Sequence, residues 1–202
     1  MTILGTTSRG LFRQLQYSMM AFALLNTGLM AQDAHTHVAT DAAKAKTPTQ
    51  AFLQGELLKA VRNATERFQN VAVAEQEGYA LQFGCVTGPD EGAMGLHYVN
   101  GNLVGTGTID VNKPQIVIYE AQPGGGLKLI GADFLVLANQ WNAAHDGPPE
   151  LMGQLFHLFD APNRFGLPPF YTLHVWAWKE NPKGAFTNWH PNVSCESFAG
   201  KK

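Results

Sequence analysis

The sequence predicts an α+β fold in which a long N-terminal helix precedes a mostly antiparallel sheet, curled into a roll or barrel. Apolar residues recur at three- and four-residue spacing from Leu53 to Val71, as on one face of a helix. From Tyr79 onward the pattern changes to short strand signals separated by turn residues. The chain also holds 21 glycines and 11 prolines, which is typical of many turns between short strands.

Length and composition indicate one globular domain. The 202 residues are enough for one hydrophobic core and few for two. Hydrophobic residues make up 45% of the chain and charged residues 15%, which argues against disorder. The formal net charge is -2, so the chain has no excess of positive charge for nucleic acid or an anionic membrane surface. We therefore expect neither as a partner, and the composition leaves the oligomeric state open.

Residues 1–31 have the features of a secretory signal peptide. Arg9 and Arg13 form a basic flank, the apolar run 19–25 (MMAFALL) follows, and Ala31 stands at the expected cleavage site. Polar and small residues interrupt the apolar stretch, which makes it a poor membrane span, although a retained N-terminal anchor is the alternative. The sequence thus predicts a periplasmic or secreted protein, without stable membrane insertion after cleavage.

A helix start follows this region. Residues 32–47 are small and polar, and are expected to form a flexible lead-in to a single α+β domain at 48–202. Thr47 can cap a helix, a proline occupies the first helical position, and Gln50 completes a capping box. Gly78 is a suitable stop. The apolar stripe of this helix is expected to pack against the sheet.

Strand signals dominate the rest of the chain. Residues 96–104 (LHYVNGNLV) predict a hairpin, because Asn100-Gly101 suits a two-residue type I′ turn. A glycine-rich loop predicts a second hairpin around residues 123–126 (PGGG). The strands of this second hairpin are expected at residues 115–120 and 127–137, and two further strands at residues 151–159 and 170–179.

The two cysteines, Cys85 and Cys195, are predicted to form a structural disulfide. They lie near the two ends of the strand-rich part, and an even pair in an exported protein is normally oxidised. A catalytic thiol would need a histidine partner, and a soft metal site would need more sulfur. The disulfide is therefore the simplest interpretation.

Polar residues inside apolar strands indicate where chemistry could occur. His97 lies in the first predicted hairpin, Glu120 ends the strand at 115–120, and His174 lies in the strand at 170–179. Two imidazoles and a carboxylate from separate strands could converge inside a barrel. This donor set suits one ion of iron, copper, nickel or zinc, with positions left for water or substrate. We therefore predict a mononuclear transition-metal site with His97, Glu120 and His174 as its ligands.

Three other interpretations remain open at this stage. Each strand histidine can instead be hydrogen-bonded within the core. The alternation in FYTLHVWAWK would place Trp176 and Trp178 on the face of His174, so that these indoles with Tyr98 could line a pocket for an apolar or aromatic small molecule. An exposed apolar surface could instead bind a partner chain.

The sequence assigns no reaction. It contains no phosphate-binding GxxxxGK[ST], no dinucleotide-binding GxGxxG, no GxSxG and no HExxH. These absences argue against nucleotide chemistry and against the common serine and zinc hydrolases. Whether the protein is an enzyme is left undecided.

Two sequence blocks carry a family resemblance. The first contains GCVTGP and GAMGLHYVNG within residues 84–101, and the second contains LHVWAW, Asn181-Pro182 and VSC within residues 173–195. Together they resemble an uncharacterised family of exported bacterial proteins, over about Tyr79 to Cys195. The resemblance implies export and a single domain, and no particular activity.

Overall fold

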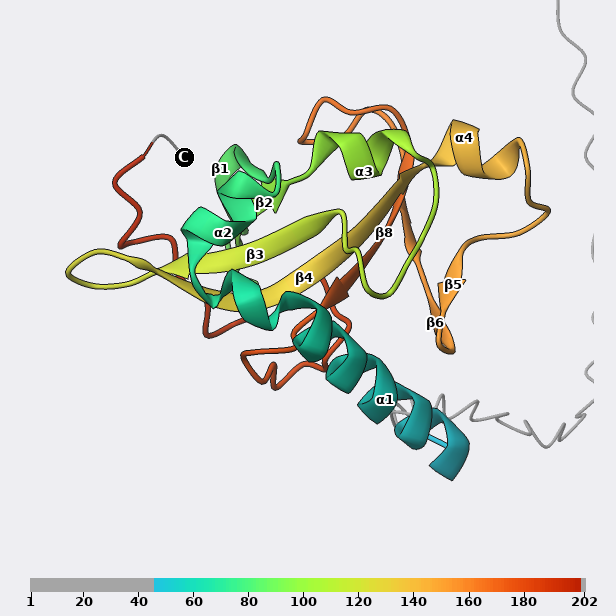
Figure 1. The fold of residues 1–202 in the computed structure, drawn as a ribbon, viewed down its shortest axis with the longest axis horizontal. Coiled ribbons are helices and arrows are strands. Elements are labelled where there is room, and N and C mark those ends of the chain that lie inside the picture. Colours follow the sequence, from blue (N-terminus) through green and yellow to red (C-terminus); the bar gives the residue numbers. More distant parts are fainter. Residues whose placement is uncertain (1–45, 201–202) are drawn as a thin grey trace, which may run out of the picture. The chain divides into compact units, whose positions relative to one another are not determined.

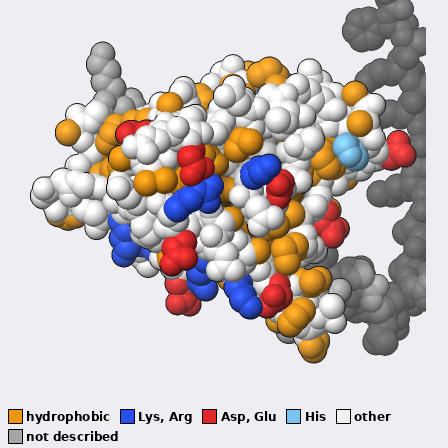
Figure 2. All heavy atoms as spheres, viewed as in Figure 1, with side chains coloured by type: hydrophobic (Ala, Val, Ile, Leu, Met, Phe, Trp, Pro, Cys, Tyr) orange, Lys and Arg blue, Asp and Glu red, His pale blue; other side chains and the backbone are white. Residues whose placement is uncertain are grey.

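The computed structural model describes residues 46–200 (Figure 1). The predicted signal peptide at 1–31 lies outside the described residues, as does nearly all of the predicted lead-in at 32–47. No helix of the described part is both long and apolar enough to cross a membrane. On the face drawn in Figure 2, acidic and basic side chains are interspersed with apolar ones.

The N-terminal helix is shorter than predicted. The expected cap is confirmed, because the Thr47 side chain accepts from the Gln50 backbone N–H while the Gln50 side chain binds the Thr47 backbone. A single helix reaching Gly78 is not confirmed. Asn70 adopts an extended conformation, and its side chain caps a new helix by accepting from Ala72 N. The helical elements here are α1 (Pro48–Thr65), the 3-10 helix η1 (Glu66–Gln69) and α2 (Val71–Gln76).

A six-stranded antiparallel sheet forms the centre of the fold, with strand order β1-β2-β3-β4-β8-β7. Its strands are β1 (Ala80–Thr87), β2 (Ala93–Val99), β3 (Ile116–Ala121), β4 (Leu127–Leu137), β7 (His157–Phe159) and β8 (Phe170–Val175). A separate small hairpin pairs β5 (Glu150–Leu151) with β6 (Gln154–Leu155). Two short helices, α3 (Gly101–Gly105) and α4 (Ala138–Asn142), lie in the connections.

Of the two predicted hairpins, one is confirmed and the other is wrong. The β3–β4 hairpin around the glycine-rich loop is confirmed. The hairpin at Asn100-Gly101 is wrong: the Asn100 side chain accepts from Leu103 N and begins α3, and its amide also donates to Glu77 O. Asparagine suits a helix N-cap as well as a tight turn, and here the contact with the helical region favours the cap.

The last two predicted strands are also shorter than expected. The segment 151–159 is divided among β5, β6 and β7. β8 ends at Val175 rather than Lys179, because the next residue, Trp176, donates its backbone N–H to Ala185 O in the C-terminal segment. The strand alternation predicted through Trp178 is therefore wrong.

Helix α1 packs against one face of the sheet, as its apolar stripe predicts. Leu57 and Val61 are fully buried in a cluster with alternate residues of β4 and β8. The sheet members of this cluster are Ala132, Phe134, Leu173 and Val175. Because side chains alternate along a strand, Asp133 and His174 project from the opposite face.

The sheet is curled into a half-barrel, and irregular pairing accompanies the curl. The register shifts twice between β1 and β2 and once between β3 and β4, and such bulges bend a strand. A Cβ added at Gly131 of β4 would lie 2.6 Å from the Val175 carbonyl oxygen, so the close approach of β8 requires glycine there. The two ends of the sheet approach one another where Phe83 of β1 meets Phe165 of the β7–β8 connection, with ring centroids 5.3 Å apart.

The predicted disulfide is confirmed. Cys85 of β1 is bonded to Cys195 of the C-terminal segment, across a sequence separation of 110 residues. Both residues are buried in the core cluster that also contains Tyr119 and Phe68. The bond therefore fixes an edge strand of the half-barrel to the end of the chain.

Candidate metal centre

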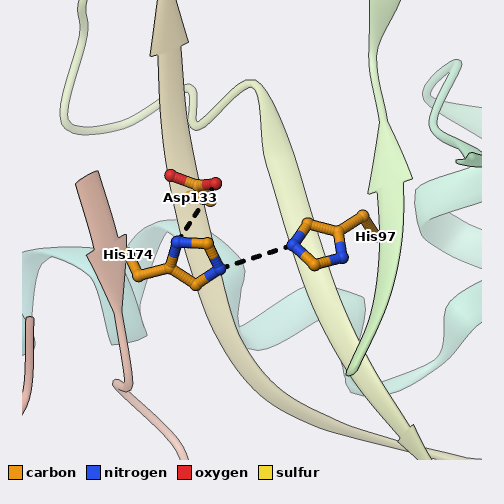
Figure 3. A group of neighbouring side chains, drawn as sticks. All are labelled: His97, Asp133 and His174. Carbon is orange, nitrogen blue, oxygen red and sulfur yellow. Dashed lines mark hydrogen bonds and ion pairs between the residues drawn. The ribbon is translucent and has the colours of Figure 1, made fainter. Parts of the chain in front are cut away.

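Three polar side chains meet on the face of the sheet opposite α1 (Figure 3). His97 comes from β2, Asp133 from β4 and His174 from β8, and Asp133 pairs directly with His174 across the two neighbouring strands. Their exposed fractions are only 5%, 3% and 3%. One ligand atom from each residue lies within 4.8 Å of the others, so this buried triad could hold a metal ion.

Curvature of the sheet brings the two imidazoles together. β2 and β8 are separated by β3 and β4. Three strand spacings would place these backbones about 14 Å apart in a flat sheet. In the curled sheet the rings point toward one another, and the Nε2 atoms of His97 and His174 are 3.4 Å apart.

This separation suits a shared metal ion as well as a long hydrogen bond. Two metal–imidazole bonds of about 2.0–2.1 Å that meet at a tetrahedral angle place their nitrogens about 3.3–3.4 Å apart. N–H···O hydrogen bonds in proteins are typically about 2.9–3.0 Å long, so a hydrogen bond between the two rings would be a long one. The 3.4 Å between His97 Nε2 and His174 Nε2 therefore matches one edge of a tetrahedral site.

Asp133 lies on the other side of the His174 ring. Its Oδ2 is 3.4 Å from His174 Nδ1, and its Oδ1 accepts a 2.5 Å hydrogen bond from the Thr172 hydroxyl. A carboxylate at Nδ1 selects the tautomer with a lone pair on Nε2 and fixes the ring orientation. Asp133 is thus placed to aim His174 Nε2 at His97.

The triad leaves buried ring nitrogens unpaired. Among the described residues, His97 Nδ1 and His174 Nδ1 are buried and have no hydrogen-bond partner. His190 makes a useful contrast, because it is fully buried and its Nδ1 accepts from Asn192 N while its Nε2 contacts Glu180 O. His190 is an ordinary core histidine, whereas His97 and His174 each keep an unpaired Nδ1 while their Nε2 atoms face one another.

Burial keeps both imidazoles neutral. It lowers the pKa of His97 to about 4, with a further contribution from neighbouring His174, and lowers the pKa of His174 to about 3. Burial also raises the pKa of Asp133 to about 6, against the opposing effect of the Thr172 hydrogen bond. At neutral pH the triad is therefore two neutral imidazoles and a carboxylate, the protonation state that metal binding needs.

A small cavity adjoins the triad. Its volume is about 30 Å³, which is room for one or two water molecules. Apart from the triad and Thr172, its lining is apolar: Phe83, Met94, Ile116, Leu135, Phe159, Phe165, Leu167 and Phe170. The Thr172 hydroxyl donates to Asp133, so the polar groups of this lining are the triad and a threonine that is bonded to it.

The third predicted ligand, Glu120, does not join the two histidines. It lies two residues beyond Ile118, which pairs with His97, so the strand carries it about 7 Å along the sheet. Its carboxylate instead accepts from Lys179 Nζ at 2.7 and 2.9 Å and from Ser194 N at 3.3 Å. Glu120 thereby anchors the C-terminal segment to β3.

The three residues predicted to line a ligand pocket also lie elsewhere. Tyr98 packs edge-on against Tyr119, with ring centroids 5.0 Å apart, beside the helical layer. The Trp178 indole donates to Thr65 Oγ1 at the end of α1. Trp176 donates to Thr187 O and is the only one of the three near the triad, with its ring centroid 5.8 Å from that of His174.

The residue that sequence reasoning missed is Asp133. A carboxylate inside the apolar run of β4 is a signal, because a lone charge within a buried strand needs a partner. That signal does not identify the partner. The pairing of Asp133 with His174 depends on the β4–β8 register, which the local pattern does not define.

Comparisons of the chain with protein-family models, curated proteins and solved structures found no match.

The stability of the metal-free protein in acid is expected to depend on the protonation of the triad. Between about pH 4 and pH 6 the unfolded chain carries protons on both histidines, whereas the folded protein carries one, on Asp133. The unfolded state binds about one proton more, so the free energy of unfolding is expected to rise with pH by about 1.4 kcal/mol per unit.

Urea unfolding of metal-free protein across that range tests this expectation. The double variant His97→Gln/His174→Gln should lose the rise, because the groups that take up protons on unfolding are gone. A free energy of unfolding that is flat or falls with pH in the unaltered protein would contradict the assignment.

Proposed function

We propose that this protein binds a single transition-metal ion through Nε2 of His97 and Nε2 of His174. The observation that carries the proposal is the 3.4 Å separation of these two buried atoms. The neutral state of both imidazoles supports it. Asp133 lies on the other side of the His174 ring, with Oδ2 3.4 Å from Nδ1, and is placed to orient the ring when an ion binds Nε2.

Two protein nitrogens leave coordination positions for other ligands. Imidazole suits zinc, copper, iron and nickel, and the donor set does not favour one of these over the rest. The cavity of about 30 Å³ beside the rings has room for a bound water molecule. This size also explains why an ion is preferred to an organic ligand, since pockets for drug-sized molecules are roughly 300 Å³ or larger.

Metal analysis of untagged protein tests the proposal. Protein purified without a histidine tag should retain about one equivalent of a transition metal, or bind one equivalent of added Zn²⁺ or Co²⁺ after chelator treatment. Binding should raise the melting temperature, because the ion binds the folded state. Protein that takes up neither ion, and whose stability is indifferent to chelators, would refute the proposal.

Replacement of Asp133 by asparagine is expected to lower the affinity for metal without lowering the stability of the metal-free protein. Loss of the carboxylate behind His174 is expected to weaken Zn²⁺ binding by about 10–100-fold. The same change removes a buried charge, so the metal-free protein should be at least as stable at neutral pH. Calorimetric Zn²⁺ titration and urea unfolding measure the two effects, and Asp160→Asn in an exposed loop is the control. A loss of both affinity and stability would contradict this role.

Export of the protein is part of the proposal. The Cys85–Cys195 disulfide supports a periplasmic or secreted location, since such bonds persist in oxidising compartments. The resemblance to exported bacterial proteins supports the same location. Cell fractionation with the intact mass of the recovered chain tests it: an exported protein should lack the residues up to Ala31, and a full-length chain in the cytosol would refute it.

A further inference from the structure

We infer that Phe83 gates the access route to the His97–Asp133–His174 triad, and that the route admits small uncharged ligands. The gate would serve the proposed metal centre, and so its purpose rests on that proposal. The observations that carry it are the backbone of β1 at Phe83 and the three cavities that Phe83 lines.

The backbone at Phe83 is strained and poorly held. Gln82 pairs with His97 and Cys85 pairs with Leu96, so Phe83 and Gly84 form a bulge without partners in β2. Phe83 has φ 65°, which is rare for a bulky side chain. Strained residues of this kind concentrate at ligand sites and switch regions.

The Phe83 side chain borders the cavity of the triad and two larger neighbouring cavities. It lines the inner cavity with the triad, and also two outer cavities of about 150 and 370 Å³. The residue is 45% exposed, and within residues 46–200 its one aromatic contact is the edge-on contact with Phe165. Rotation of this ring would therefore connect the triad with space that opens outward.

Both ends of the bulge are fixed, which confines the motion. Gln82 is held by its pairing with His97, and Cys85 is held by the disulfide to Cys195. Only two residues between these points need to move. The displacement is local, and β1 stays paired with β2 on either side.

The walls of the route define the ligand class. The route runs through the cavity of about 150 Å³, which shares Ile116, Leu135 and Leu167 with the cavity of the triad, whereas the cavity of about 370 Å³, beside Arg164, shares only Phe83 and Phe165 with it. The lining of the route is mainly apolar. An anion would lose its hydration along these walls and meet the Asp133 carboxylate at the end. A metal ion differs, because imidazoles replace its water ligands. The route therefore admits small uncharged molecules with an apolar body.

Acylation of the histidines in metal-free, full-length protein tests the gate. Diethyl pyrocarbonate is small and uncharged, and it acylates neutral imidazole. Peptide mass spectrometry follows His97 and His174 separately from the exposed His145 and His157, which serve as internal references. In Phe83→Ala the acylation rates of His97 and His174 should rise by about tenfold, because local opening of the route becomes easier. The acylation rates of the two reference histidines should not change.

Two further variants make the result decisive. Phe83→Gly suits the positive φ and removes the ring, so it should give the same increase in a stable protein. Phe52→Ala alters an exposed phenylalanine on α1 and should leave all four rates unchanged. Unchanged rates at His97 and His174 in both Phe83 variants would overturn the gate.

A protection assay tests the ligand class. Phenol, which is uncharged at neutral pH, should slow acylation of His97 and His174 in unaltered protein, whereas benzoate at the same concentration should not. Equal protection by benzoate, or no protection by phenol, would overturn the ligand class. Neither assay uses a metal. A negative result would therefore refute the gate without bearing on the proposed metal centre.

Discussion

Replacement of His174 by glutamine is expected to reduce affinity for Zn²⁺ or Co²⁺ by more than about a hundredfold, a larger loss than a change in an outer-sphere partner causes. The variant removes one of two protein nitrogens that lie 3.4 Å apart, and the remaining imidazole of His97 cannot chelate alone. Glutamine keeps a polar group of similar length in the site. Calorimetric titration, and the visible absorption of bound Co²⁺, measure the loss.

A neighbouring histidine provides the matched control for this experiment. His157 lies on β7, next to β8, and is exposed, so His157→Gln should bind metal as the unaltered protein does. His97→Gln should show the same loss as His174→Gln, and the double variant little more, since one chelate is destroyed in each case. Retention of full affinity in both single variants would place the metal elsewhere.

Removal of the disulfide is expected to have the largest effect on stability. The bond closes a loop of 110 residues, for which the chain-entropy model gives about 4–5 kcal/mol. The double variant Cys85→Ala/Cys195→Ala should lose about that amount of unfolding free energy. Because the total for a domain is about 5–15 kcal/mol, this loss should lower the fraction folded at physiological temperature.

Urea unfolding of the oxidised protein, the reduced protein and the double variant measures this contribution. The reduced protein and the variant should agree closely, which controls for packing changes at the two buried positions. A difference of less than about 1 kcal/mol between oxidised and reduced protein would contradict an entropic role for the bond.

Sequence patterns predicted those features that depend on residues close together in the chain. Thr47 and Gln50 form the capping box that their spacing indicates, and the glycine-rich loop joins β3 to β4. The start of α1 and this hairpin could therefore be predicted. The Cys85–Cys195 bond could be predicted for a different reason, because the chain contains only two cysteines. Asn100 shows the limit of local patterns, since the same side chain suits a turn and a helix cap, and a contact with Glu77 selects the cap.

The candidate site could be predicted only in part. His97 and His174 attract notice as polar residues within apolar strands, and they do meet. The carboxylate that joins them is Asp133 rather than Glu120, because pairing registers place Asp133 beside His174 while Lys179 engages Glu120. Register and curvature arise from contacts between distant strands, and a pattern within one strand contains neither.

The centre depends on the curl of the sheet, and this dependence extends to residues on its reverse side. The gap between the two imidazoles is set by how tightly β2 and β8 bend toward each other, and Leu57 and Val61 of α1 press on the back of β4 and β8. A tetrahedral ion and an octahedral ion require different distances between adjacent donors. Side chains that never touch an ion would thus tune which ion is selected, and metal preference could drift through core substitutions while both ligands stay unchanged.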